Sequence, residues 1–169
     1  MRKVAYIIVL SIPMYLAFLL VSGLSVPLLD LILGYIISLA VSALVYEVLV
    51  REHKKLLQLH RLAYLVKYFF RYITVIEFRA HSDVIKRIFS PKMPINPGIV
   101  KVPYHVVSDY ALTTIANSIT NTPGTVVVDV DEEEKKLFVH WIDVKGIEEE
   151  LCYEKISKEF EEYAKKIFD

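Results

Sequence analysis

The sequence predicts an integral membrane helical hairpin of two spans, followed by an interfacial amphipathic helix and a small C-terminal α+β domain with the element order β-α-β-β-α. Three observations lead to this fold: two nearly uncharged runs at the start, an excess of Lys and Arg directly after them, and a change of hydrophobic period beyond a proline cluster. We therefore divide the chain into residues 1–50 for the spans, 51–96 for the basic interfacial segment and 97–169 for the domain.

The two spans are indicated by length and by the lack of charge. Residues 4–29 contain no charged side chain, and after Asp30 residues 31–46 are again uncharged. Since a bilayer core requires about 20 apolar residues per helix, we expect spans near residues 4–21 and 28–50. Small residues on the second span predict close packing against the first span or another subunit; they are Gly34, Ser38, Ala40, Ser42 and Ala43.

A cleaved signal peptide is the alternative interpretation of the N-terminus, because Arg2 and Lys3 precede an apolar run. A second apolar run follows the first, where a secreted protein would continue with polar sequence, and this favours two spans. The single cysteine, Cys152, cannot form an internal disulfide, so nothing indicates an oxidising compartment.

The charges are distributed very unevenly although the net charge is zero. Residues 51–101 carry eleven Lys and Arg against three acidic residues, whereas residues 102–169 carry seven against fifteen. Basic residues also precede the first span, and none lies between the spans. Because cytoplasmic flanks of spans are rich in Lys and Arg, we expect a multi-pass plasma-membrane protein with both termini in the cytoplasm. The position of the basic segment beside a span accounts for its charge without a nucleic acid.

The segment 62–89 is predicted to form a basic amphipathic helix. Its apolar residues recur at helical spacing; they are Leu62, Leu65, Val66, Phe69, Ile73, Ile76, Ala80, Val84 and Ile88. The segment is too charged for a third span, and a basic, aromatic-rich helix beside a membrane is typical of the bilayer interface. A helix buried against other subunits is the alternative.

Beyond the prolines at 91, 94 and 97 the pattern changes to short strands and helices. We expect strands over 99–107, 125–130 and 136–144, a helix over 110–119, and a last helix whose apolar stripe runs from Ile147 to Ile167. This order implies a small sheet with helices on one face. His140 and Trp141 are neighbours on a strand, so they should point to opposite faces of the sheet.

Residues 122–125 read Thr-Pro-Gly-Thr, the order that a type II turn requires. Proline presets the first central dihedral angle, and glycine tolerates the positive φ of the second. We therefore expect a positive φ at Gly124, and we interpret these four residues as a structural corner and not as a ligand site.

The sequence offers little chemistry of its own. Asp30 and Glu47 are ionisable residues near the ends of the second span, where they are candidates for an ion path or for contacts with other subunits. His53 and His60 alone fall short of a metal site, and phosphate-binding or nucleophile motifs are not found in the sequence. We expect no catalytic residue, no metal and no cofactor.

Two stretches of the domain carry a resemblance to a known family. Residues 117–130 read Asn-Ser-Ile-Thr-Asn-Thr-Pro-Gly-Thr-Val-Val-Val-Asp-Val, and residues 139–144 read Val-His-Trp-Ile-Asp-Val. Together they resemble the E-type subunit of the multisubunit Mrp-type monovalent cation/proton antiporters, and the paired spans fit this family too. The family-motif residues to which we assign a structural role are Asn117, Thr122, Pro123, Gly124, Thr125, Asp129, His140 and Asp143.

The resemblance implies a non-catalytic accessory subunit of a membrane complex that exchanges Na+ or K+ for protons, with a role in assembly and ion transport. Its partners would be the other membrane subunits and the lipid bilayer. An equivalent subunit occurs in archaeal membrane-bound hydrogenase and sulfur-reducing complexes, which is the alternative context. A self-standing membrane-anchored binding module, whose acidic domain docks a soluble partner, is a further alternative.

Overall fold

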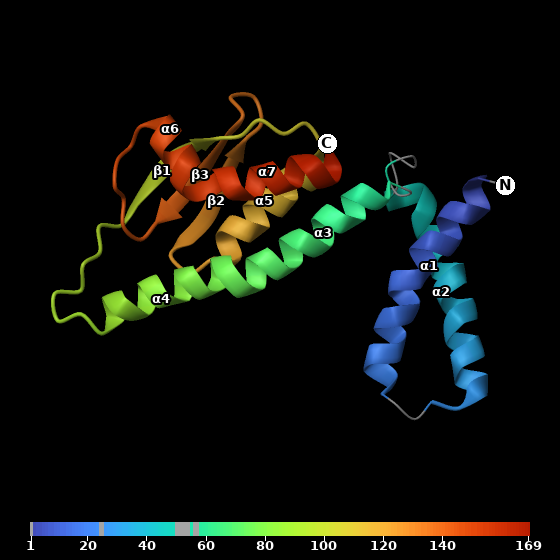
Figure 1. Cartoon of the computed structure of the whole chain (residues 1–169). Coiled ribbons are helices and arrows are strands. Elements are labelled where there is room, and N and C mark those ends of the chain that lie inside the picture. Colours follow the sequence, from blue (N-terminus) through green and yellow to red (C-terminus); the bar gives the residue numbers. More distant parts are fainter. Residues whose placement is uncertain (1, 24–25, 50–54, 56–57) are drawn as a thin grey trace. The chain divides into compact units, whose positions relative to one another are not determined.

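The computed structural model describes residues 2–23, 26–49, 55 and 58–169 (Figure 1). Their contacts divide the chain into two compact units, Met1–Leu59 and His60–Asp169. Parts of several predictions lie outside the described residues: the middle of the turn between the spans, the end of the second span at Val50, and most of residues 51–57, including His53.

The first unit is a pair of packed helices, α1 (Arg2–Ser22) and α2 (Leu28–Leu49). Both contain stretches long and apolar enough to cross a bilayer, Lys3–Ser22 with 20 residues and Leu28–Tyr46 with 19 residues. Pro13 lies inside α1. The two predicted helices of the hairpin are thereby confirmed as helices of spanning length.

Small side chains on α2 allow close contact between the two helices. Gly34 packs directly beneath the ring of Phe18, which occupies the space that a Cβ atom would need. Ser38 donates a hydrogen bond to the Gly34 carbonyl and Ser42 donates one to the Ser38 carbonyl, both at 2.7 Å. These hydroxyls are therefore satisfied within their own helix. Ala40, in contrast, is exposed on this unit.

The second unit is built on a three-stranded antiparallel sheet. Its strands β1 (Gly98–Pro103), β2 (Thr125–Asp131) and β3 (Lys136–Trp141) lie in the order β1-β3-β2. Helices α5 (Asp109–Asn121) and α7 (Lys158–Phe168) pack with the sheet around one core. The predicted order β-α-β-β-α is confirmed.

One face of the sheet supplies this core because side chains alternate along each strand. Val100, Val102, Leu137 and Val139 are at most 4% exposed and contribute to the core cluster with the two helices. The register pairs Ile99 with His140 and His140 with Val126, so these side chains share the opposite face. There Ile99 is 61% exposed and Val126 44%.

The last helix begins later than the sequence predicts. It comprises α6 (Glu149–Cys152), a π-helical segment η3 (Tyr153–Ser157) and α7. Ile147 precedes the helix and is 77% exposed, so the prediction that it starts the apolar stripe is wrong. Ile147 has the helical spacing of the stripe, but the helix begins two residues later, at Glu149.

A long helix runs along the domain, formed by α3 (Leu59–Arg71), the π-helical segment η2 (Tyr72–Ile76) and α4 (Glu77–Ile88) (Figure 1). Its Tyr68 and Ile76 are buried in the domain core. Leu62, Phe69 and Ile73 are more than half exposed. The apolar residues from which the amphipathic helix was predicted therefore do not all share one side, because Ile76 belongs to one face and Leu62, Phe69 and Ile73 to another.

The π-helical segment explains how both faces stay in line along the helix. In an uninterrupted α-helix, the eight residues from Tyr68 to Ile76 would leave these side chains about 80° apart. A π-helical turn accommodates one extra residue, and in η2 this brings Ile76 back under Tyr68. The extra residue likewise keeps the exposed side chains before and after η2 on one face of the helix.

Candidate functional site

The corner at residues 122–125 lies where α5 passes into β2. Gly124 has a φ of 101°, which confirms the predicted positive dihedral angle. The Thr125 amide donates to the Thr122 carbonyl at 3.3 Å, and the Gly124 carbonyl accepts the Ile142 amide at 2.8 Å. The corner thus continues the pairing between the strands beyond the end of β3.

The two threonine hydroxyls of the corner are used to end α5. Thr122 Oγ1 donates to the Ser118 carbonyl and Thr125 Oγ1 to the Ile119 carbonyl, each at 2.7 Å. Carbonyls in the last turn of a helix lack the usual partner within the helix, and these hydroxyls add to the Thr122 amide, which the Ile119 carbonyl accepts at 3.2 Å. The arrangement supports a structural role for both residues.

A cavity of about 250 Å³ lies beside the corner. Its wall combines the corner with Asp83 and Arg87 of α4, Trp141 of β3, and Glu154 and Glu159 of the last helix. These acids are already engaged, because Glu154 pairs with Lys158 and Glu159 with Arg71. The wall therefore joins the long helix to the domain.

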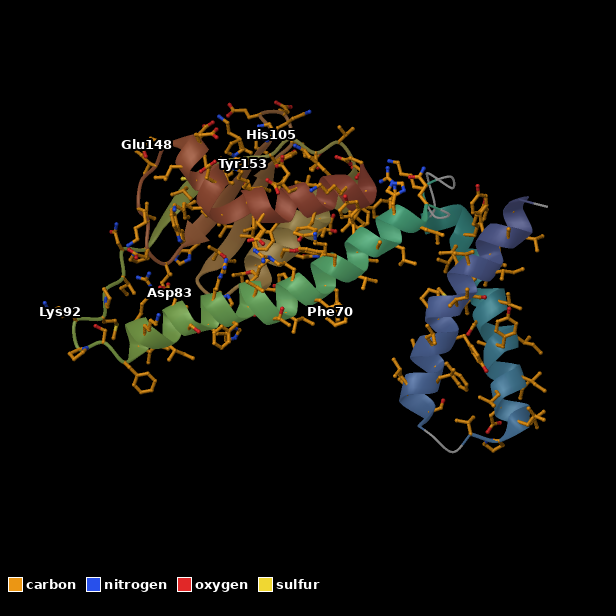
Figure 2. The ribbon with its side chains drawn as sticks, in the orientation of Figure 1. Phe70, Asp83, Lys92, His105, Glu148 and Tyr153 are labelled. Atoms are coloured by element: carbon orange, nitrogen blue, oxygen red, sulfur yellow. The ribbon has the colours of Figure 1, made fainter. Side chains whose placement is uncertain are left out.

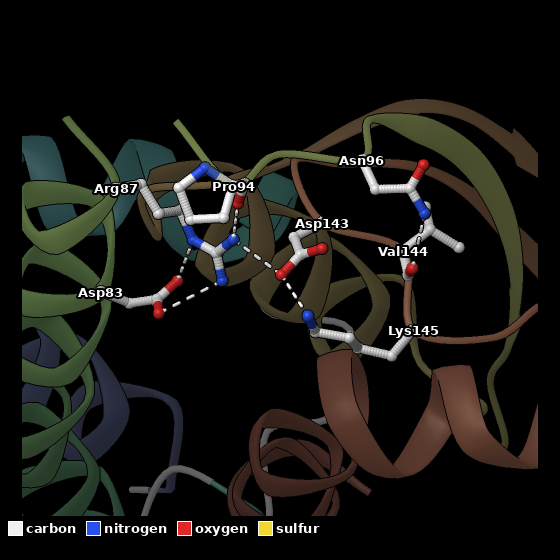
Figure 3. Close-up of polar contacts among 7 residues, drawn as sticks. All are labelled: Asp83, Arg87, Pro94, Asn96, Asp143, Val144 and Lys145. Carbon is white, nitrogen blue, oxygen red and sulfur yellow. Dashed lines mark hydrogen bonds and ion pairs between the residues drawn. The ribbon is translucent and has the colours of Figure 1, made fainter. Parts of the chain in front are cut away.

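An ionic cluster closes the contact at the end of α4 (Figure 3). Arg87 Nε lies 2.7 Å from Asp83 Oδ2, and Arg87 Nη1 lies 2.6 Å from Asp143 Oδ2. Lys145 pairs with the same Asp143 oxygen, and Arg87 also donates to the Pro94 carbonyl. The Arg87 and Asp143 side chains are only 15% and 12% exposed, whereas Asp83 and Lys145 are 56% and 59% exposed, so water is largely kept from the centre of the cluster but not from its ends.

The neighbouring charges shift the pKa values of the two central groups, Asp143 and Arg87. The Lys145 ammonium and then the Arg87 guanidinium lower the pKa of Asp143, while the Asp83 carboxylate raises the pKa of Arg87. Around the cluster, the Asn96 side chain donates to the Val144 carbonyl at 3.0 Å. The cluster therefore fastens the loop after α4 to the chain after β3.

This fastening predicts a pH-dependent effect of Asp143→Asn. Because the pKa of Asp143 is lowered in the fold, its contribution is complete above the ordinary value of about 4 and is lost as the pH falls through the folded pKa. The variant should melt below the native protein at pH 7, and the difference should shrink in strongly acidic buffer. Fluorescence of Trp141, the one tryptophan in the sequence, follows the melting of this domain.

Asp129→Asn is the matched control for that experiment. Asp129 is exposed, and its carboxylate accepts the adjacent Val130 amide at 2.9 Å, a local bond that an amide oxygen can also accept. Its replacement should therefore change melting little at either pH. An equal loss for Asp143→Asn at neutral and acidic pH would contradict the assignment of an ionised Asp143.

The other family-motif residues lie away from the corner. Asn117 is exposed on α5. Asp129 pairs with Phe138 across the ladder, and His140 stands two residues after Phe138 on β3, so Asp129 and His140 share the open face of the sheet. Trp141 packs against the core on the other face, which confirms that His140 and Trp141 point to opposite sides. The structure therefore groups Asp143 with the corner and separates the remaining motif residues from it.

Of the two carboxylates on the second span, the structure describes the side chain of Asp30. Asp30 is exposed in the first turn of α2, where the helix dipole favours a negative charge. Glu47 lies in the last turn of α2, and its side chain is outside the described residues. A role of either carboxylate in an ion path stays a prediction.

Two sets of interacting residues were not predicted from the sequence. Asp83 and Arg87 stand four apart on a helix, a spacing that favours ion pairs, but their link to Asp143 joins distant parts of the chain. The second set surrounds Glu161, which is fully buried. Its spacing from Ser157 and Ala164 follows the helix period, so its position on the inner face could have been inferred.

Together these features define a class: a helical hairpin of spanning length with a small α+β domain. A family model described as Na+/H+ ion antiporter subunit matches residues 11–167. The chain belongs to this family, and the resemblance to the E-type subunits is confirmed.

Named relatives agree with this assignment. The E subunit of the Na+/H+ antiporter of Alkalihalophilus pseudofirmus is 33% identical over 70% of this chain and 72% of its own length. The E1 subunit of the Staphylococcus epidermidis antiporter is 29% identical over 82% of each chain. Among solved structures, a chain of an archaeal membrane-bound sulfane sulfur reductase superposes with a TM-score of 0.80 at 32% identity, covering 99% of this chain and 100% of that chain.

Proposed function

We propose that this chain is a non-catalytic accessory subunit of a multisubunit monovalent cation/proton antiporter-type membrane complex. The observation that carries the proposal is the family match, which extends over residues 11–167 and so includes both the hairpin and the domain. The superposition on a chain of a membrane-bound respiratory complex likewise covers 99% of this chain. The partners of the chain are then the other membrane subunits of such a complex.

The polar groups of the hairpin support an accessory role. The buried hydroxyls of Ser11, Ser38 and Ser42 bond to carbonyls of their own helices, and Asp30 lies exposed at a helix start. A charge in lipid must be paired or hydrated to be tolerated, so an ion path requires groups from larger partners. The chain would then brace the membrane subunits and the cytoplasmic surface of the complex.

A redox-driven complex is the second candidate context. The full-length superposition on a chain of a sulfane sulfur reductase favours it, whereas the named sequence relatives are antiporter subunits. Both contexts assign the chain the same accessory role beside an antiporter-like module. They differ in the additional subunits that the complex contains.

Purification of the chain from its native membrane tests the proposal. Large multi-span antiporter-like proteins should co-purify, and iron–sulfur or nickel-containing subunits among them would identify the redox context. The pure chain in proteoliposomes should show no Na+- or K+-dependent proton flux. Recovery of a soluble protein alone would support the membrane-anchored binding module, and robust exchange by the isolated chain would refute the accessory role.

The proposed topology has both termini in the cytoplasm. It rests on Arg2 and Lys3 before the first helix and on the basic residues after the second. In a Cys152→Ser background, Ser22→Cys should react with an impermeant thiol reagent added to intact cells, and Glu148→Cys should react only after lysis. Both native residues are exposed. The reverse labelling pattern would refute this orientation.

A further inference from the structure

The side of the long helix that points away from the domain carries a continuous apolar face. We define this outer face by Leu62, Val66, Phe70, Ile73, Phe78 and Ile85, which are between 48% and 72% exposed. Figure 2 shows Phe70 pointing away from the domain, while Asp83 lies on the side toward it. Soluble proteins rarely leave so extended an apolar surface uncovered.

The π-helical segment η2 keeps the outer face continuous. If all these residues followed an α-helix without the π-helical turn of η2, Phe78 and Ile85 would be rotated by about 100° from Phe70 and Val66. With it, the six side chains lie along one line on both sides of the segment. The face thus has the length of the whole helix from α3 to α4.

A row of basic side chains borders this face. Lys67, Arg79 and Lys86 are exposed, and their spacing places them along one edge of the helix once η2 is allowed for. Among the residues that the structure describes, none of the three forms an ion pair. Arg71 and Arg87, by contrast, pair with acids of the domain side.

Two polar side chains on the outer side, Thr74 and His81, bond to carbonyls of their own helix. Thr74 Oγ1 donates to the Phe70 carbonyl at 2.7 Å, and His81 Nδ1 lies 2.9 Å from the Glu77 carbonyl. These two atoms therefore need no hydrogen bond from whatever covers the outer face. Lipid supplies apolar contact without such bonds, whereas protein interfaces usually include them.

We infer that the outer face seats on the bilayer, with its apolar side chains among the upper acyl chains and Lys67, Arg79 and Lys86 above anionic headgroups. This inference rests on the proposed function, which places α2 in the membrane. The ten steps of chain from Leu49, the end of α2, to Leu59, the start of α3, can span at most about 36 Å. The helix would hold the whole α+β domain flat against the cytoplasmic leaflet.

Quenching by lipid-borne spin labels tests the inference. The full chain with Cys152→Ser and either Phe70→Cys or Phe78→Cys is labelled with the fluorophore NBD and placed in nanodiscs containing phosphatidylglycerol. Doxyl groups near the top of the acyl chains should quench both probes. A probe at Glu148, which Figure 2 shows on the α6 side of the domain, is the control and should keep its fluorescence.

A second variant isolates the basic edge. Combined K67Q, R79Q and K86Q substitutions should weaken quenching at Phe70→Cys and remove its dependence on phosphatidylglycerol, while Trp141 fluorescence shows that the domain stays folded. Unquenched probes at both positions in nanodiscs would overturn the inference. Shielding that arises only within the purified complex would also overturn it, because a protein subunit would then cover the face.

The outcomes separate this inference from the proposed function. Quenching in nanodiscs without co-purifying membrane subunits would support lipid seating while the accessory role failed. Co-purification of membrane subunits without quenching would support the accessory role and refute lipid seating.

Discussion

Glu161→Ala is expected to lower the free energy of unfolding of the α+β domain by about 3 kcal/mol, because it removes a buried acceptor of several hydrogen bonds and leaves a cavity in its place. The Glu161 side chain is fully buried. One oxygen accepts the His105 amide at 3.0 Å, and the other lies 2.6 Å from Lys165 Nζ and 3.1 Å from His105 Nδ1. The variant leaves these donors without their acceptor.

Tyr153 completes the surroundings of Glu161. Its hydroxyl donates to Glu161 Oε1 at 3.3 Å, and its ring meets the His105 ring edge to face at 5.2 Å. Burial and the nearby carboxylate raise the pKa of Tyr153 to about 12, so the hydroxyl stays a donor at all ordinary pH values. The group thereby fastens the segment between β1 and α5 to the C-terminal helix.

Urea unfolding followed by Trp141 fluorescence measures the effect, with Glu162→Ala as the control. Glu162 carries the same charge on the same helix but is exposed, so its loss should cost less than about 0.5 kcal/mol. Lys165 is 41% exposed and can rehydrate, which keeps the expected cost of Glu161→Ala at the lower end for a buried pair. Equal stability of the two variants would show that the buried hydrogen bonds of Glu161 do not stabilise the domain.

Gly124→Val is expected to destabilise the same domain by about 2–4 kcal/mol, combining backbone strain with overpacking. The φ of 101° disfavours any side chain with a Cβ, and a β-branched one most. A Cβ atom at this position would also stand 3.0 Å from Ile142 Cγ2. The corner would have to open, and the bond from the Ile142 amide to the Gly124 carbonyl would be lost with it.

Two alanine variants separate the strain from the crowding. Gly98→Ala brings a Cβ to 3.1 Å from Val144 Cγ2 but has no positive φ, whereas Gly124→Ala meets both conditions. Gly124→Ala should therefore be the less stable of the two in the same urea experiment. A Gly124→Val protein as stable as the native one, yet unable to join its complex, would instead indicate that the corner is a contact site.

The order of elements in the domain could be predicted because its determinants are local. Strand alternation, the Ser108 start of α5 and the Pro-Gly turn each lie within a few residues of the feature that they specify. The Ser108 hydroxyl accepts the Ala111 amide at 3.2 Å and so caps the start of α5. Local chemistry of this kind is visible without knowledge of the fold.

The faces of the long helix could not be predicted in the same way. The residues that turn toward the domain include Tyr64, Tyr68 and Tyr72, and tyrosine suits a core, a surface or an interface equally well. Tyr68 is held in the core by its hydrogen bond to the hydroxyl of Ser118, which lies 50 positions away in the sequence. The pairing of Arg87 with Asp143 is likewise a product of tertiary structure, so the candidate site emerged only with the fold.

The π-helical segment has a consequence for insertions and deletions in this family. Since η2 holds one residue more than the α-helix around it, a chain that lacked Thr74 would form an uninterrupted α-helix with both faces still aligned. A one-residue deletion elsewhere, for instance at Lys67, would turn everything on one side by about 100°. Length changes in this helix should therefore be tolerated at residues 72–76 and selected against in the flanking turns.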